Sequence, residues 1–146
     1  MKKMKRIGWR EWVSLPDLGI SWIKAKTDTG ARTSALDVKK LETFTEGETA
    51  MVRITYRSRK KVLASLSEVT VPVLESRTIK DSGGKEHLRV VIETTLVMGG
   101  ESHKIELTLS NRRNMRFPML IGRTAIRKKY LVDPGRSYLT GKPEQK

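Results

Sequence analysis

The sequence contains no cysteine, which excludes a disulfide framework, a thiolate zinc site and a cysteine nucleophile from this chain. No apolar run is long enough to span a bilayer, and the basic N-terminus lacks the apolar stretch of a signal peptide. These absences predict a cytoplasmic protein with no membrane partner. Aromatic residues make up only 5% of the 146 residues, which argues against a base-stacking platform for single-stranded nucleic acid.

Acidic residues are far fewer than basic residues. The chain has 30 Lys and Arg against 16 Asp and Glu, a formal net charge of +14. So large an excess predicts an anionic partner. On charge alone that partner is nucleic acid, an acidic peptide or a membrane surface.

Alternation of apolar and polar residues dominates the pattern and predicts an all-β, mostly antiparallel protein. Half-buried strands are expected over residues 52–57, 69–73 and 105–109. Gly99-Gly100 predicts a tight hairpin turn, because glycine adopts positive φ without a steric penalty. We also expect one domain over residues 1–146, as the length fits a single core.

A second, longer hairpin is expected from residue 71 to residue 93, with a polar tip at residues 81–84 that would suit a mobile flap. Helical signal is limited to one short segment, residues 122–130. Pro134-Gly135 predicts a turn before a last strand.

That last strand is expected over residues 137–140. The ordered core should therefore cover residues 6–140, and residues 141–146 should form a frayed tail.

An Asp-Thr-Gly tripeptide, Asp28 to Gly30, follows the strand-like segment "SWIKAK". It places a carboxylate where a strand turns into a loop, and glycine there lets other backbone approach closely. Taken alone, the tripeptide is equally typical of an Asx turn without catalytic meaning.

The wider motif "KTDTGARTSAL" (26–36) resembles the active-site motif of retropepsin-like aspartic proteases. "FPMLIGRTAI" (117–126) resembles their second signature, in which two apolar residues and Gly-Arg precede a short helix. The two motifs occur in the order of that family, separated by a hairpin pattern where those enzymes carry their flap. The resemblance implies a supporting loop behind the active-site strand, formed by Leu120, Ile121, Gly122 and Arg123.

A closer resemblance covers residues 7 to 139. With the segments "IGWREWVSLPDLGISWIKAKTDTGARTSAL", "RTIKDSGG" and "NMRFPMLIGRTAI", the chain is similar to a bacterial family long labelled putative ATP-dependent zinc protease, which is related to the retropepsins and associated with RimK-type ATP-grasp glutamate ligases. The implied fold is a closed retropepsin-like barrel with one short helix and one flap hairpin per subunit.

The implied activity is that of an aspartic peptidase, which needs two adjacent carboxylates because one must hold a proton while the other activates water. The chain has one Asp-Thr-Gly, so a homodimer would supply Asp28 from each subunit. In this arrangement Thr29 bonds across the twofold axis, Gly30 leaves backbone open to the substrate and Ala31 packs beneath.

The zinc and ATP of the family label find little support in the residues. The histidines are His87 and His103 alone, without His-Glu-x-x-His, and relatives often have a histidine where this chain has Asp37. No Gly-x-x-x-x-Gly-Lys-Ser/Thr loop is present for ATP. We expect no metal and no cofactor.

An acidic substrate fits the charge. Arg32 would lie on the floor of the cleft and present its guanidinium to a carboxylate. The resemblance supplies a matching substrate, the glutamate tail that a RimK-type ligase adds to a ribosomal protein. Basic residues on the flap and before the supporting loop would extend the positive field: Arg77, Lys80, Arg89 and Arg113.

Alternative interpretations remain open. Each basic residue alone is equally explained as a solvated surface charge. The protein as a whole would also fit a noncatalytic module whose basic cleft binds an acidic tail or RNA, or a zinc peptidase. Arg123, at a helix start, should have an acidic partner near Asp28, at Glu11 or at Asp133. The three tryptophans, Trp9, Trp12 and Trp22, are expected in the core or in a dimer contact, and Met115 and Met119 in packing.

Overall fold

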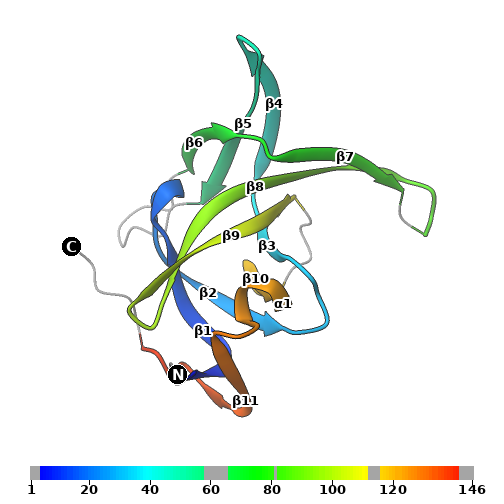
Figure 1. Cartoon of the computed structure of the whole chain (residues 1–146). Helices are drawn as coiled ribbons and strands as arrows, with labels where there is room; N and C mark the ends of the chain where they lie inside the picture. The colour runs from blue at the N-terminus through cyan, green and yellow to red at the C-terminus, as the bar shows by residue number, and fades with distance from the viewer. Residues whose placement is uncertain (1–3, 58–65, 81, 112–115, 142–146) are drawn as a thin grey trace.

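The computed structural model describes residues 4–57, 66–80, 82–111 and 116–141. They form an all-β structure with one short α-helix and one 3-10 turn (Figure 1). The elements are β1 (Lys5–Leu15), η1 (Pro16–Leu18), β2 (Ile20–Asp28), β3 (Ser34–Asp37), β4 (Lys40–Glu46), β5 (Thr49–Arg57), β6 (Leu66–Pro72), β7 (Glu75–Lys80), β8 (Glu86–Met98), β9 (Glu101–Ser110), β10 (Met119–Gly122), α1 (Arg123–Ile126) and β11 (Tyr130–Ser137). Among the described residues, no helix has the length and apolar character needed to cross a membrane.

Six strands close into a barrel. The larger sheet has the order β11-β1-β2-β10-β3-β9-β8-β7, and a further pairing of β1 with β8, at Ser14 and Val97, joins its ends around β1, β2, β10, β3, β9 and β8. β11 and β7 extend the sheet beyond the closed part. The expected closed all-β barrel with one short helix is confirmed.

Three of the strand pairings are parallel: β1 with β11, β2 with β10, and β3 with β9. The remaining pairings are antiparallel, as the sequence predicted. The parallel pairings matter for function because they place the ends of β2 and β10 at the same edge of the barrel.

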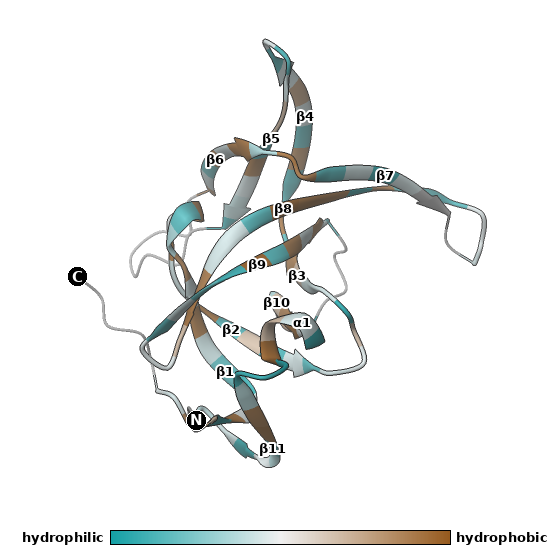
Figure 2. Ribbon diagram, viewed as in Figure 1, coloured by the Kyte–Doolittle hydropathy of each residue, from teal (hydrophilic) through white to brown (hydrophobic). Residues whose placement is uncertain are grey.

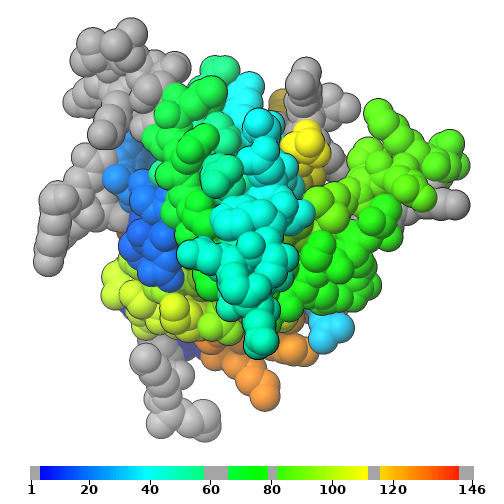
Figure 3. All heavy atoms as spheres, turned by 90° about the horizontal axis from the view of Figure 1, so that it is seen from above, coloured from blue at the N-terminus to red at the C-terminus, as the bar shows by residue number. Residues whose placement is uncertain are grey.

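A separate three-stranded sheet, β4-β5-β6, lies over one end of the barrel. Figure 3 views the molecule from that end, where the cyan and green atoms of this sheet cover the middle of the face. The arm formed by β7 and the start of β8 extends to one side, with Lys80 opposite Glu86. It is the expected long hairpin, but its pairing begins at Glu75 opposite Val91 and not at residue 71, because residues 71 and 72 belong to β6. Asp81, part of the predicted tip, lies outside the described residues. Figures 1 and 3 both place this arm on the side of the barrel where the loop after β2 lies.

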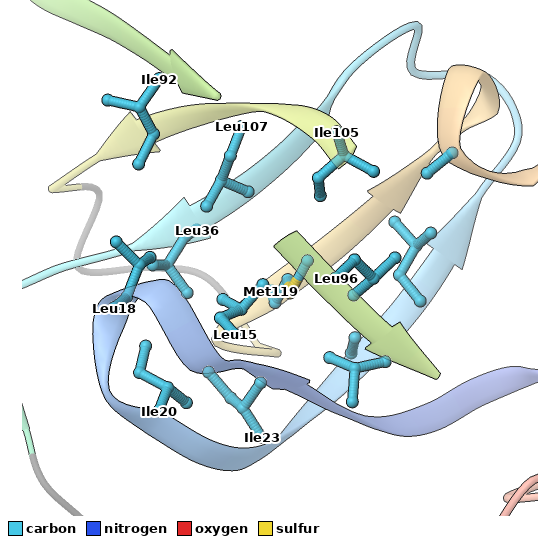
Figure 4. Close-up of a cluster of buried hydrophobic side chains, with 14 of the residues drawn as sticks. Leu15, Leu18, Ile20, Ile23, Leu36, Ile92, Leu96, Ile105, Leu107 and Met119 are labelled. Atoms are coloured by element: carbon cyan, nitrogen blue, oxygen red, sulfur yellow. The ribbon is translucent and has the colours of Figure 1, made fainter. Parts of the chain in front are cut away.

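The barrel interior is filled by aliphatic side chains from all six strands (Figure 4). Strand alternation supplies them, because every second residue points inward, and the same alternation appears as brown and teal bands along β4 and β9 in Figure 2. Met119 is fully buried, so its predicted packing role is confirmed, whereas Met115 lies outside the described residues. The fully buried residues labelled in Figure 4 include Leu15, Leu36, Ile92, Leu96 and Leu107.

The tryptophans are not part of this buried cluster. Trp12 packs edge-on against Trp22 and stacks on Tyr138, while Trp9 contacts Phe117 edge-on. All three are half-buried, so the expectation of core positions was wrong. A role in a dimer contact stays a prediction.

The hairpin between β8 and β9 turns at Gly99-Gly100, whose φ angles of 61° and 79° need glycine. This prediction is confirmed. The helix is shorter than the expected 122–130: α1 ends at Ile126, and Lys128, with a φ of 68°, cannot continue it.

The last strand also differs from the expected 137–140. β11 runs from Tyr130 to Ser137 and includes the predicted turn at Pro134-Gly135. A register shift opposite Gly8 and Arg10 accommodates the irregular stretch, and β11 is an edge strand, where proline is tolerated because no neighbour needs its missing N–H.

Candidate active site

Asp28 is the last residue of β2 and lies beside Gly122, the last residue of β10. The two strands are parallel here, so the segments that follow them leave the barrel at the same edge. The Asp-Thr-Gly loop and the Gly-Arg segment, which lie far apart in the sequence, therefore meet in space.

Backbone hydrogen bonds fix the orientation of the Asp28 side chain. Its Oδ1 accepts N–H bonds from Gly30 at 3.2 Å and from Ala31 at 3.3 Å, and the Ala31 N–H also lies 3.2 Å from the Asp28 carbonyl oxygen. The loop is thus an Asx turn with a half-buried carboxylate. Among the bonds between described residues, none involves the second oxygen, Oδ2. A carboxylate held at one oxygen in this way suits general acid-base work at the other.

Gly122 supports the loop from behind through close contact. Its N–H donates to the Ser34 hydroxyl oxygen at 3.0 Å, in a buried bond. A Cβ on Gly122 would lie 2.3 Å from the Thr33 carbonyl carbon. Only glycine fits here, because any side chain would push the segment before β3 away from β10.

Replacing Gly122 by Ala is expected to lower the free energy of unfolding by about 3 kcal/mol, since the new methyl group forces two backbone segments apart. The urea midpoint measures this change. Gly30→Ala is the matched control, because its Cβ would meet only the Asp28 Oδ1, at an ordinary 3.4 Å. Equal midpoints for the two variants would show that the contact between Gly122 and Thr33 does not constrain the loop.

The first turn of α1 completes the support. The Arg123 N–H donates to the Ala31 carbonyl at 2.7 Å, and the Thr124 N–H and hydroxyl both donate to the Arg32 carbonyl at 3.0 Å. The Arg123 guanidinium donates to the Thr29 carbonyl at 3.1 Å. The contact lies in the neighbourhood of Asp28, one of the three places considered for Arg123, but the partner is a backbone carbonyl and not the expected acidic side chain.

The other two candidate partners of Arg123 are engaged elsewhere. The fully buried Glu11 carboxylate accepts bonds from the Gly8, Leu139 and Thr140 N–H groups and from the Thr140 hydroxyl, at 2.6 to 3.1 Å. It ties the segment after β11 to β1. Asp133 accepts an N–H bond from Gly135 at 3.0 Å.

The predicted substrate-binding residues are distributed over several elements. Arg32 is exposed on the Asp28 loop. Arg77 and Arg89 lie directly opposite each other on the arm, and Arg77 also forms an ion pair with Glu75. Lys80 ends β7, and Arg113 lies outside the described residues.

The two histidines of the chain lie on different parts of the structure. His87 pairs with Ile79 on the arm, whereas His103 on β9 lies 2.9 Å from the Tyr130 hydroxyl. Burial raises the pKa of Tyr130 to about 12, helped by the nearby negative charge of Glu101. Within the described ranges, no three His, Cys, Asp or Glu side chains gather closely enough to hold a metal ion.

Asp37 stands in β3, where the resemblance implies that relatives often carry histidine. Burial raises the pKa of its carboxyl. Its Oδ1 has no hydrogen-bond partner within the described part of the chain. Its backbone N–H bonds to the Pro118 carbonyl at 2.8 Å, which ties β3 to the start of β10.

Sequence reasoning missed one feature near Asp28. A hollow of about 360 Å³ is lined by Trp9, Arg10, Lys26, Arg116, Phe117 and Leu120. Its residues come from three separate segments, so no local sequence motif predicts the hollow. The sequence pattern that could have indicated it is the strand alternation, which places Lys26 on the same face of its strand as Asp28.

Comparison with known proteins adds the family. A family profile described as "RimB-like: Retropepsin-like aspartic endopeptidase RimB" matches residues 6–143. Proteins named "Probable alpha-L-glutamate ligase" from Shewanella pealeana and Desulfotalea psychrophila are 40% and 38% identical over 139 and 130 residues, which cover 92% and 89% of this chain. The chain spans only 30% and 28% of the length of these two relatives.

A solved structure shows the same fold. It is the crystal structure of Lpg0085, a protein of unknown function from Legionella pneumophila, with a TM-score of 0.76 and 22% identity over 94% of this chain and 99% of that one. The fold, the two motif loops and the profile match agree. The chain belongs to the RimB-like family of retropepsin-like aspartic endopeptidases.

Proposed function

We propose that this chain is an aspartic peptidase that acts as a homodimer and hydrolyses peptide bonds in an acidic, glutamate-rich segment. The observation that carries the proposal is the setting of Asp28. Its Oδ1 is fixed by two backbone N–H groups, and its loop is supported by Gly122 and Arg123. Such a preorganised carboxylate at a strand end is suited to activating water.

The dimer is required by the chemistry. One Asp28 must be ionised to take a proton from water, while a second, protonated carboxyl donates a hydrogen bond to the scissile carbonyl oxygen. The water oxygen then bonds to the carbonyl carbon, and the C–N bond breaks as a proton passes to the leaving nitrogen. A twofold axis beside Asp28 supplies both carboxyls from one motif, with the exposed Thr29 of each loop at the contact.

The acidic substrate is supported by charge. Arg77 and Arg89 lie opposite each other on β7 and β8, and since, among the described residues, Glu75 pairs with Arg77 alone, the pair of arginines keeps an excess of positive charge. Exposed Arg32 adds positive charge on the Asp28 loop, and Lys80 and Arg113 are proposed to do the same. Relatives named glutamate ligase fit a substrate made by glutamate addition. We therefore place a RimK-type ligase and its ribosomal protein product among the partners, with nucleic acid secondary.

A peptide that ends in a run of glutamates is the direct test. Mass spectrometry should find shortened products after incubation with the purified protein, and none from the matched glutamine peptide. If the glutamate peptide binds but stays intact, the protein is a noncatalytic module that holds acidic tails, and the peptidase proposal fails.

Chelation separates the aspartic mechanism from a zinc peptidase. Hydrolysis should continue at an unchanged rate, within about twofold, after dialysis against EDTA, because two carboxylates and water need no metal. The initial rates with and without EDTA measure this. Loss of activity that returns with added zinc would overturn the aspartic mechanism.

A further inference from the structure

The hollow beside Asp28 lies on the outer face of the barrel. Lys26 and Asp28 are two residues apart on β2, so their side chains lie on the same face, about 7 Å apart along the strand. The strand register repeats this relation, because Leu120 pairs with Lys26 and Gly122 with Asp28. The hollow therefore adjoins the candidate catalytic carboxylate.

Three cationic side chains line this hollow: Arg10, Lys26 and Arg116. Among the described residues, no carboxylate lies within ion-pair distance of any of them. Positive charges gathered without a counter-charge repel one another, and an anion that enters the hollow relieves the repulsion. The charge thus favours a negatively charged ligand.

Arg10 is held in place before any ligand arrives. Its guanidinium lies 4.5 Å from the centre of the Trp9 ring and 5.1 Å from that of Tyr138, and its Nε donates to the Ser137 hydroxyl oxygen at 3.1 Å. A guanidinium fixed at one nitrogen and on its faces keeps its outer N–H groups for planar recognition of a carboxylate.

The remaining walls are apolar. Trp9 and Phe117 meet edge-on, with ring centres 5.9 Å apart and an interplanar angle of 83°, and Leu120 lies beside them. Perpendicular rings leave no parallel slot for a flat nucleobase, but they offer surface to a short aliphatic chain. Apolar walls with a few converging polar groups are typical of small-ligand sites, and here they suit methylene groups that end in a carboxylate.

We propose that this hollow is a carboxylate-binding pocket, which we call the Lys26 pocket, and that it holds one carboxylate of the peptide substrate close to the hydrolysed bond. This inference rests on the proposed peptidase function for the location of that bond. Its chemistry fits a glutamate side chain or the carboxylate at the end of a chain. The Lys26 pocket would therefore bind an acidic group of the substrate next to Asp28, independently of the arginines of the arm.

Binding is best measured by calorimetry in the Asp28→Asn variant, so that no substrate is consumed. Three peptides separate the sources of the carboxylate: polyglutamate with an amidated end, polyglutamate with a free end, and polyglutamine with a free end. We expect Lys26→Gln and Arg116→Gln each to weaken binding of the amidated polyglutamate roughly tenfold. Both residues are exposed, so folding should be unaffected, and Lys26→Arg should restore binding.

Arg57→Gln, an exposed charge change on the separate sheet, is the matched control and should alter the Kd less than about twofold. Equal weakening by Arg57→Gln and Lys26→Gln would reduce the effect to overall charge and overturn the proposal. So would unchanged binding in both pocket variants. Pocket-dependent binding of polyglutamine with a free end, but not of amidated polyglutamate, would assign the pocket to a terminal carboxylate and support it.

Turnover distinguishes failure of this inference from failure of the peptidase proposal. In the protein that retains Asp28, Lys26→Gln should raise KM for the glutamate peptide and leave kcat within about threefold. Hydrolysis that is indifferent to the pocket variants would remove the inference and keep the peptidase. Pocket-dependent binding without hydrolysis would remove the peptidase and keep the carboxylate site.

Discussion

Replacing Asp28 by Asn should abolish hydrolysis of a glutamate-tailed peptide, with kcat lowered by more than about 10³-fold. Asparagine keeps an oxygen in the place of Oδ1, so the N–H bonds from Gly30 and Ala31 and the fold should survive. It removes the group that exchanges a proton with water. Initial rates followed by mass spectrometry measure the loss.

The matched control is Glu93→Gln, an acid-to-amide change at an exposed position of β8. Its rate should equal that of the unmodified protein. Peptide binding should remain in Asp28→Asn, because the substitution removes a negative charge and so adds no repulsion against an acidic ligand. Turnover retained by Asp28→Asn would remove this residue from the chemistry.

Replacing Glu11 by Gln should lower the stability of the fold about as much as replacing Gly122 by Ala. The Glu11 carboxylate is fully buried and accepts four hydrogen bonds, two at each oxygen. The glutamine amide nitrogen would replace one carboxylate oxygen and place its N–H groups against two protein donors. Those two donors would lose their acceptor. We expect a loss of about 3 kcal/mol and a Tm lower by roughly 10 °C.

Thermal unfolding followed by circular dichroism measures this loss. Glu93→Gln is again the control, and its Tm should change by only about 1 °C, because exposed substitutions have small effects. Glu11→Leu buries an apolar side chain of similar size but leaves all four donors without an acceptor, so this variant should also be destabilised. A Tm for Glu11→Gln that matches the control would contradict the anchoring role of this carboxylate.

Much of the site could be predicted because its signals are local. Asp28-Thr29-Gly30 and the segment around Gly122 each occupy a few consecutive residues. The resemblance to a known family predicted that the Gly122 segment supports the Asp28 loop. The two hairpins were predictable as well, since alternation and a glycine pair at Gly99 are sequence-local features.

Long-range pairings could not be predicted in the same way. Parallel pairing of β1 with β11 joins the two ends of the chain, and no turn residue marks such a contact. The turn residues Pro134-Gly135 lie inside β11 instead of before a last strand. The Gly135 N–H bonds to the Asp133 carboxylate, and the register with β1 passes from Asp133 to Ser137, so the local turn chemistry is present as an irregularity within a strand that the sequence did not predict.

Two structural features, Glu11 and the hollow beside Asp28, were missed because each depends on neighbours that are distant in sequence. Glu11 shares the inward parity of Ile7, Val13 and Leu15 in β1, a pattern that marks a buried acid once the strand is known. The Lys26 pocket needs β1, β2 and the segment before β10 in one place. The net charge of the chain predicted that an anion binds, but not where it binds.

The central claim is that one carboxyl from each of two chains forms the catalytic pair. Mixed dimers test it most directly, with unmodified protein and Asp28→Asn co-refolded in equal amounts so that the subunits combine at random. If both carboxyls are needed, activity per total chain should fall to about a quarter, because only dimers with two Asp28 residues work. A fall to about one half would mean that each chain acts alone, and would contradict the shared pair.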